Sequence, residues 1–594
     1  MPSSPIVSGQ DLVTISVLIA GTAMSSLYQV FSVEVGKGVG KIPYAKIKLE
    51  DGSAPDQDFP ISAKSDFVPG TEIEIKAGYN STESSIFKGV IVKHGVRVKS
   101  NRSTLVIECR DKAIKMTFGR KCDIATNKLD SAIISTLIGN AGLSADVTAT
   151  KVTHKEIIQY YVSDWDFMLL RAEANGLMVN VEAGKVSVKV PDTSSAAGLV
   201  VTYGLSIIEA NLDIDALGQT PGAEASAWDA ATQKMVKGTA PSSSLKTTGN
   251  VPYSTLSKIM SSENSKLLSS ASLPSGELTA WATGKLNKAN LSKVTGKVRF
   301  QGNSTIKPMA MLELAGLGAR FNGDAFVGAV YHYIEGGEWF TDAHIGVSFD
   351  WFCEEAQNVE PPFASGLMSP MKGLHIGIVT KMHADPDGLY RVQVKIPTLQ
   401  KDSVMIWARM ANFYATVKAG EFFYPEIGDE VILGFLNEDP RHPIILGSMY
   451  NKTNMPPVTP ADKNFIKTIV SNKKMLIKFD DENVIFTIDT PDKNTIILDD
   501  KTDKITIIDV NKNKIEMSST GILIESCKDI NIKAPKGDVN ITAININDKA
   551  TANVSIKGIQ VTAEGAAQFT GKGAMAEVSA SGITTIKGAL VKIN

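Results

Sequence analysis

The side chains of this chain that could do acid–base or metal chemistry are scattered along it. None of the seven histidines follows His442. His332 and His344 flank a turn and have the residue type of metal ligands, yet a histidine satisfied within the fold is the commoner arrangement. Asp385 and Asp387 match part of a calcium loop, but the remaining ligand spacing is missing. We therefore expect a tight turn here and no metal site.

Motifs for phosphate binding or hydrolysis are also missing, since the sequence has no GxxxxGK(S/T), HExxH or GxSxG. The run Gly36-Lys-Gly-Val-Gly40 lacks the GxGxxG spacing and a following helix pattern, so it predicts a hairpin or loop. Asp164, Trp165 and Asp166 cluster, and we interpret them as the start of a helix capped by Ser163 with a buried tryptophan. The four cysteines are far apart, without a CxxC pair, as expected of reduced thiols. We expect no enzymatic activity and no cofactor.

The last quarter of the chain is a repeat array. From about Lys504 it repeats two aliphatic residues one position apart, followed by a polar gap. Alternation with a period of two predicts short β-strands with one apolar face. That narrow face has nothing in its own chain to pack against, and the spacing of roughly 7–10 residues is short for a single-chain coil, which needs about 18–22.

We therefore predict an intertwined homotrimeric β-helix, or needle, over residues 466–594, with a single-chain solenoid as the alternative. The apolar pairs should form its trimer core, which includes Ile505, Ile507, Ile515, Met517, Ile522, Ile524, Ile530, Ile532, Val539 and Ile541.

Length and charge narrow the class of protein. The 594 residues predict three to five domains. The 61 basic and 63 acidic residues are nearly balanced, so nothing favours nucleic acid or an anionic membrane as a partner. The N-terminus lacks a basic region followed by an apolar core, and no run of 18 apolar residues occurs. We expect assembly in the cytoplasm without a signal peptide.

The rest of the chain predicts a mainly β protein. Alternating strands with short turns favour a small barrel over residues 1–120. Residues 121–217 predict an α/β subdomain, and residues 218–297 a surface connection followed by a helix. Residues 298–360 return to barrel-like strands, and the five strand signals of residues 372–450 predict an OB-type barrel.

Several runs in fixed order resemble the OB domain of VgrG-type spike proteins of contractile injection systems. They are Gly373-Leu-His-Ile-Gly-Ile-Val379, Gly420-Glu-Phe-Phe-Tyr-Pro-Glu-Ile-Gly-Asp-Glu-Val431 and Asp439-Pro-Arg-His-Pro-Ile-Ile-Leu-Gly-Ser-Met-Tyr-Asn451. The run from Tyr161 to Gly176 is similar to a helix of the hub half of that family. The resemblance spans essentially the whole chain.

The resemblance implies two hub β-barrels with small α/β insertions, an OB-fold collar and the trimeric needle. Two barrels per chain give six around the axis, which would match a sixfold inner tube to a threefold needle. The expected partners are two further copies, the inner tube protein, baseplate components, possible effector cargo and a PAAR-type tip protein, with the target membrane pierced mechanically and no nucleic acid bound. The tip protein would dock on the last residues, Leu590, Val591, Lys592, Ile593 and Asn594.

Three kinds of contractile machine fit these features. We favour an extracellular phage-tail-like particle, released or secreted on firing, over a type VI secretion tip or a phage tail spike. A carbohydrate-binding or -cleaving β-helical tailspike is the alternative from another class. Phe479, Phe486 and Phe569 are the needle's aromatic residues, and the lack of Trp and Tyr there argues against a sugar-binding groove.

Overall fold

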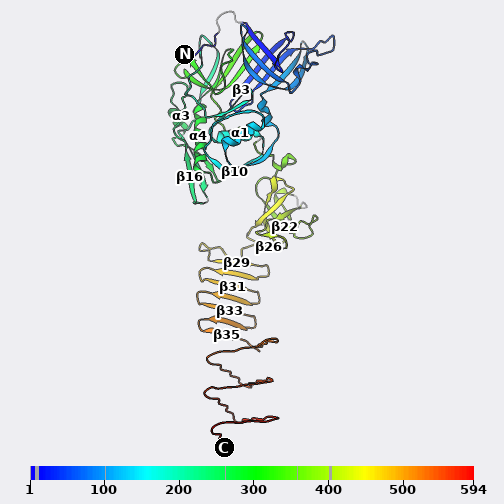
Figure 1. Ribbon diagram of the computed structural model, residues 1–594, viewed down its shortest axis with the longest axis vertical. Coiled ribbons are helices and arrows are strands. Elements are labelled where there is room, and N and C mark those ends of the chain that lie inside the picture. The colour runs from blue at the N-terminus through cyan, green and yellow to red at the C-terminus, as the bar shows by residue number, and fades with distance from the viewer. Residues whose placement is uncertain are drawn as a thin grey trace. The chain divides into compact units, whose positions relative to one another are not determined.

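The computed structural model describes residues 2–6, 12–100, 102–229, 231–260, 262–356, 359–400 and 405–593. Strands form most of its regular structure, which confirms the predicted mainly β class (Figure 1). The chain has two compact units, Met1–Ser448 and Met449–Asn594. None of the helices in the described ranges is both long enough and apolar enough to span a membrane.

The largest element of the first unit is a sheet of thirteen strands. Its main order is β14-β18-β21-β20-β3-β4-β7-β6-β5-β1-β2, and β19 joins β13 to β20. The strands are β1 (Val13–Ile19), β2 (Thr22–Ala23), β3 (Val30–Gly38), β4 (Tyr44–Glu50), β5 (Glu72–Tyr79), β6 (Thr82–Lys99), β7 (Arg102–Arg110), β13 (Leu199–Thr202), β14 (Ile207–Ile214), β18 (Val294–Gln301), β19 (Met311–Ala315), β20 (Gly323–Glu335) and β21 (Glu338–Ile345).

The pairing of β3 with β20 unites the two predicted hub barrels in one continuous sheet. Val35 lies opposite His332, although the two strands are far apart in sequence. One hydrophobic core, with Val35 and Ile47, serves the N-terminal strands, and another, with Phe300 and Val330, serves the later ones. Alternation along each strand therefore buries two cores on one shared sheet.

An α/β insertion follows β7, as the sequence predicts. It holds helices α1 (Asp130–Asn140) and α2 (Asp164–Ala174), the ribbon β8 (Lys121–Leu129) with β10 (Thr153–Val162), and the sheet of β9 (Ser144–Val147), β11 (Met178–Glu182) and β12 (Lys185–Lys189). Ser163 Oγ accepts a hydrogen bond from Asp166 N at 3.1 Å, and Trp165 is buried. The cluster of Asp164, Trp165 and Asp166 is therefore a capped helix start, as predicted.

The expected surface connection within residues 218–297 is more ordered than predicted. It forms the sheet β15 (Ala223–Asp229), β16 (Lys234–Thr239) and β17 (Ser265–Ser269), besides α3 (Tyr253–Met260) and the predicted helix, α4 (Ser275–Leu291). Ala223, Ala225 and Ala227 are buried in one core with residues of α4. Alanine is a weak strand former, so alanines at alternate positions did not indicate a strand in the sequence.

A closed five-stranded barrel, which we call the OB barrel, confirms the prediction for residues 372–450. Its strands are β22 (His375–Lys381), β23 (Val392–Lys395), β24 (Met405–Met410), β27 (Glu430–Phe435) and β28 (Pro443–Ser448). A small hairpin, β25 (Ala415–Thr416) with β26 (Ala419–Gly420), lies between β24 and β27. Helix α5 (Phe352–Glu355) precedes the barrel.

The second unit begins as one antiparallel ladder of seven strands, each five residues long (Figure 1). They are β29 (Ile466–Val470), β30 (Leu476–Asp480), β31 (Ile485–Asp489), β32 (Thr495–Asp499), β33 (Lys504–Ile508), β34 (Lys514–Ser518) and β35 (Gly521–Glu525). Aspartates close the turns: Asp509 Oδ1, for example, accepts from Asn513 N at 2.8 Å. No strand is assigned in the described residues 526–593.

A buried ionic cluster ties the helices of the hub together. The carboxylate of Asp130 in α1 accepts from Arg171 Nε at 2.7 Å and from Arg171 Nη2 at 2.9 Å, and Asn175 Nδ2 donates to it at 2.8 Å. Arg171 Nη2 also donates to Glu277 of α4 at 3.0 Å, and His154 of β10 lies 2.9 Å from Asp130 Oδ2. Burial alone would raise the pKa of Asp130, but the hydrogen bonds and charge of Arg171 outweigh it and hold that pKa below its usual value.

Replacing Arg171 should therefore destabilise the hub. In Arg171→Met the carboxylates of Asp130 and Glu277 lose their shared cation, and we expect a loss of about 3–5 kcal/mol in the free energy of unfolding. Thermal unfolding followed by tryptophan fluorescence measures it. Arg441→Met removes a surface partner of Asp439 and should change the midpoint little. Equal midpoints for Arg171→Met and the unaltered protein would contradict this account.

His332 is a buried neutral group at the centre of the sheet. Its Nδ1 lies 3.0 Å from Thr341 Oγ1, and its ring lies 5.8 Å from that of Trp339. Burial lowers the pKa of His332 from 6.5 to about 3. Between pH 6.5 and 3, His332 binds a proton in the unfolded chain but not in the folded chain. The contribution of His332 to the free energy of unfolding is therefore present above pH 6.5 and is lost as the pH falls toward 3.

The pH dependence of stability should change when this group is removed. In His332→Phe, the free energy of unfolding should fall less steeply between pH 6.5 and 3, by up to about 1.4 kcal/mol per pH unit. Urea unfolding at a series of pH values measures the slope. His442→Phe, at an exposed position, should keep the original slope, and parallel slopes for His332→Phe and the unaltered protein would show that burial does not hold His332 neutral.

Candidate functional site

The needle ladder presents one apolar face that its own chain does not cover. Direct cross-strand pairing aligns its side chains in two rows. One row is Ile469, Ile477, Ile488, Ile496, Ile507, Ile515 and Ile524; the other is Lys467, Phe479, Phe486, Leu498, Ile505, Met517 and Ile522. We call these two rows the apolar face. Lys467 is their one polar member, whereas the opposite face mixes Thr468, Lys478, Thr506 and Glu516 with aliphatic residues.

The structure brings six of the predicted core residues together on this face. They expose between 37% and 70% of their surface: Ile505, Ile507, Ile515, Met517, Ile522 and Ile524. The other four lie beyond the last assigned strand and expose between 53% and 71%: Ile530, Ile532, Val539 and Ile541. Their participation in a core remains a prediction, since within one chain nothing buries them.

The backbone of this second segment is as unpartnered as its side chains. Outside helices and strands, the one backbone–backbone hydrogen bond within the described residues 526–593 joins Gly537 N to Ala534 O. Backbone groups without partners are costly when they lie away from water. The expected docking residues Leu590, Val591 and Ile593 are exposed as well, at 74%, 47% and 88%. Asn594 lies outside the described residues.

The candidate metal and calcium residues do not assemble into a site. On neighbouring strands, His332 pairs with Thr341 and His344 pairs with Ala329, so the two rings are not brought together. Arg391 binds the carboxylates of both Asp385 and Asp387, and its guanidinium holds the pKa of Asp385 well below its usual value. Among the described residues, no three His, Cys, Asp or Glu side chains gather in a group that could hold a metal ion.

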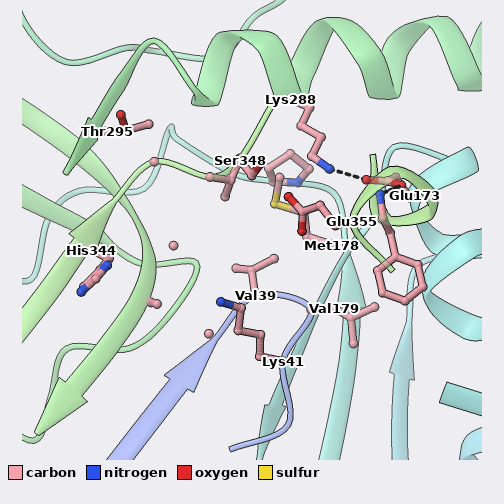
Figure 2. Close-up of a pocket in the computed structure, with 18 of the residues that line it drawn as sticks. Val39, Lys41, Glu173, Met178, Val179, Lys288, Thr295, His344, Ser348 and Glu355 are labelled. Carbon is pink, nitrogen blue, oxygen red and sulfur yellow. Dashed lines mark hydrogen bonds and ion pairs between the residues drawn. The ribbon is translucent and has the colours of Figure 1, made fainter. Parts of the chain in front are cut away.

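The hub contains a pocket that no sequence motif indicates. A cavity of about 860 Å³ lies between the end of β3, the strands β18 and β21, and helices α2 and α4. Figure 2 shows residues that line it. Lys41, Glu173, Met178, Lys288 and His344 line it, and they come from distant parts of the sequence. No spacing motif could have indicated it.

Two charged groups of this pocket, from α2 and α4, pair with each other. Lys288 Nζ donates to Glu173 Oε1 at 2.5 Å (Figure 2). Phe352 N donates to Glu173 Oε2 at 2.8 Å. Burial lowers the pKa of His344, and its ring lies 4.8 Å from that of Tyr331. The charges of Lys288 and Glu173 are therefore partnered within the pocket.

Known proteins resemble parts of this chain. Type VI secretion system spike protein VgrG2a of Pseudomonas aeruginosa is 32% identical over 143 residues, 22% of this chain and 17% of that protein. The actin cross-linking toxin VgrG1 of Vibrio cholerae is 47% identical over 53 residues, 9% of this chain and 5% of the toxin. The chain thus spans less than a fifth of the curated relatives it matches. An E. coli type VI secretion component, described as structurally similar to T4 tail proteins gp27 and gp5, aligns over 73% of this chain and 99% of its own, with a TM-score of 0.39 and 13% identity.

Two family models match consecutive parts of the chain. The model described as the Alg8 N-terminal domain covers residues 9–336, more than half of the chain. The model described as the type VI secretion system/phage-baseplate injector OB domain covers residues 375–450, the range of the OB barrel. The chain therefore belongs to the Alg8 N-terminal domain family, and parts of it, including the injector OB domain, are similar to VgrG-type spike proteins.

Proposed function

We propose that three copies of this chain form the central spike of a contractile injection machine, with a rigid needle that pierces the target membrane mechanically. The observation that carries the proposal is the apolar face. Apolar patches on monomeric proteins rarely exceed a few hundred Å², whereas this face presents thirteen large apolar side chains in two unbroken rows. Such a face is stable in water only when it packs against another.

Identical chains can bury the apolar face because each chain presents the same face. Three ladders around one axis would turn all six rows inward and leave the polar faces, with Lys478, Thr506 and Glu516, in water. Residues 526–593 then obtain their missing strand partners from the other two chains. A strand that occupies part of a turn, at a spacing of 7–10 residues, suits such winding. The shared ladders would leave no free edges, which suits a needle under axial load.

The finer assignments follow from the spike role. The hub sheet would adapt the sixfold inner tube and baseplate to the threefold needle, and a PAAR-type tip protein would dock on Leu590, Val591, Lys592, Ile593 and Asn594. Leu590 and Ile593 support this docking because their side chains are largely exposed. We propose no enzymatic activity for this chain. The relative named as a toxin matches it over only 5% of the toxin's length.

The setting of the machine is also a proposal. We place the spike in an extracellular phage-tail-like particle, assembled in the bacterial cytoplasm and released or secreted on firing. The names of the curated relatives favour the alternative, a type VI secretion tip. Neighbouring genes separate the two: sheath, baseplate and AAA+ ATPase genes without a membrane complex support the particle, and membrane-complex genes support the type VI tip.

A charge on the apolar face should prevent trimer formation. Ile507→Lys would place three ammonium groups in one apolar core, and burying unpaired charges costs free energy. Each step of about 1.4 kcal/mol in this cost lowers the affinity between the chains tenfold. Light scattering on the purified full chain should report a trimer for the unaltered protein and a much smaller species for Ile507→Lys.

The matched control is the neighbouring residue on the opposite face. Thr506→Lys lies across from Glu516 and should leave the trimer intact. A stable monomer for the unaltered chain, or a trimer of Ile507→Lys as stable as that of Thr506→Lys, would refute the proposed assembly.

A further inference from the structure

The pocket of the hub has the size and the lining of a ligand site. Its volume of about 860 Å³ lies within the range of about 300–1,000 Å³ that pockets for small ligands occupy. Leu169, Leu177 and Val179 line it as buried apolar side chains, and Met178 and Val347 line it half-buried. A ligand in this pocket would therefore bury an apolar body.

A close approach of two helices fixes one wall of the pocket. Gly176, after the end of α2, has φ +67°, and a Cβ there would lie 3.1 Å from the Cα of Gly284 in α4. The two glycines let the helices pass this closely. Glu173 of α2 binds Lys288 of α4 and accepts a hydrogen bond from the N–H of Phe352 in α5. Since α5 is thereby tied to both longer helices, this side of the pocket is preorganised.

Lys41 brings a positive charge to the pocket that no described residue pairs. The other two lysines of the lining are paired: Lys288 lies 2.5 Å from Glu173, and Lys297 lies 3.0 Å from Glu209. Within the described ranges, no carboxylate forms an ion pair with Lys41. An exposed lysine with a free ammonium group beside an apolar lining suits an anionic ligand group.

His344 adds a hydrogen-bond donor to this positive side. Burial is the main cause of the lowered pKa of His344, and the charges of Lys297 and Lys41 lower that pKa further, against the opposing charge of Asp342. The ring is therefore neutral at physiological pH and keeps one N–H to donate. Lys41 and His344 together can bind a carboxylate.

Glu355 brings an unpaired negative charge to another side of the pocket. It ends α5 and is exposed, and no described cation forms an ion pair with it. Figure 2 shows its carboxylate apart from the amine of Lys41, with Val39 between them in this view. Asp213, on the edge strand β14, is a second exposed carboxylate of the lining. The pocket thus presents opposite charges at separate places, which a ligand with two opposite charges would complement.

We infer that the pocket binds a short free peptide, with its terminal carboxylate at Lys41 and His344 and its terminal ammonium at Glu355. A peptide of about three or four residues falls in the size class of small ligands, and its apolar side chains would pack against Met178 and Val347. A segment inside a protein chain carries neither terminal charge, and the end of a protein carries only one of them. Every residue of the site belongs to one chain, so the inference stands apart from the proposed trimer.

Isothermal titration calorimetry on the purified full chain tests this binding with the tetrapeptide Leu-Ala-Ala-Leu. Two blocked forms are compared with it, one acetylated at the amine and one amidated at the carboxylate. Because each block removes one charged contact, each should weaken binding about tenfold. Lys41→Met should weaken binding of the free peptide about tenfold and leave the affinity for the amidated form unchanged, and Glu355→Gln should do the same for the free and the acetylated forms.

Matched controls carry the same substitutions at exposed positions outside the pocket. Lys258→Met in α3 and Glu335→Gln at the end of β20 should keep the affinity of the unaltered protein for all three peptides. The inference is overturned if the free tetrapeptide does not bind at millimolar concentration, or if the free and blocked forms bind equally. It is also overturned if Asp213→Asn, and not Glu355→Gln, removes the preference for the free amine. Light scattering on the same samples reports the trimer separately, so loss of the trimer bears on the proposed spike alone.

Discussion

The rest of the account depends on an apolar sheet face that its own chain leaves in water. In the ladder β29–β35, direct cross-strand pairing collects phenylalanine, isoleucine, leucine and methionine side chains on one side. The backbone of this ladder is satisfied, but its side chains are not. In the described residues 526–593, outside helices and strands, the backbone makes one backbone–backbone hydrogen bond, from Gly537 N to Ala534 O. Further copies of the chain would meet both deficits, because they would bring apolar faces and strand partners together.

In the hub, by contrast, the apolar faces of the sheet are buried within the same chain. One sheet carries two hydrophobic cores, and the pairing of Val35 with His332 holds its halves together. A buried charge of the hub is paired within the same chain, as Asp130 is by Arg171. The chain therefore buries the apolar side chains of these two cores by itself.

Much of the fold could be predicted from the sequence because large aliphatic residues alternate with polar residues along the strands. This alternation predicted the OB barrel, and it placed Ile505 and Ile507 on one needle face, because a period of two has a single structural meaning in short strands. It failed where the buried residues were alanines, as at Ala223 and Ala225. The pocket beside Lys288 was beyond prediction because its residues meet only through tertiary folding. The predicted core at Ile530 and Ile532 has no counterpart within one chain, since its neighbours would be other copies.

Electron cryo-microscopy of the full-length needle in cross-section tests the central claim most directly. The account predicts threefold symmetry, with Phe479 and Ile507 of all three chains facing a common axis and residues 526–593 paired as strands between chains. A single coil that stacks on itself, or a sandwich of two ladders, would contradict it.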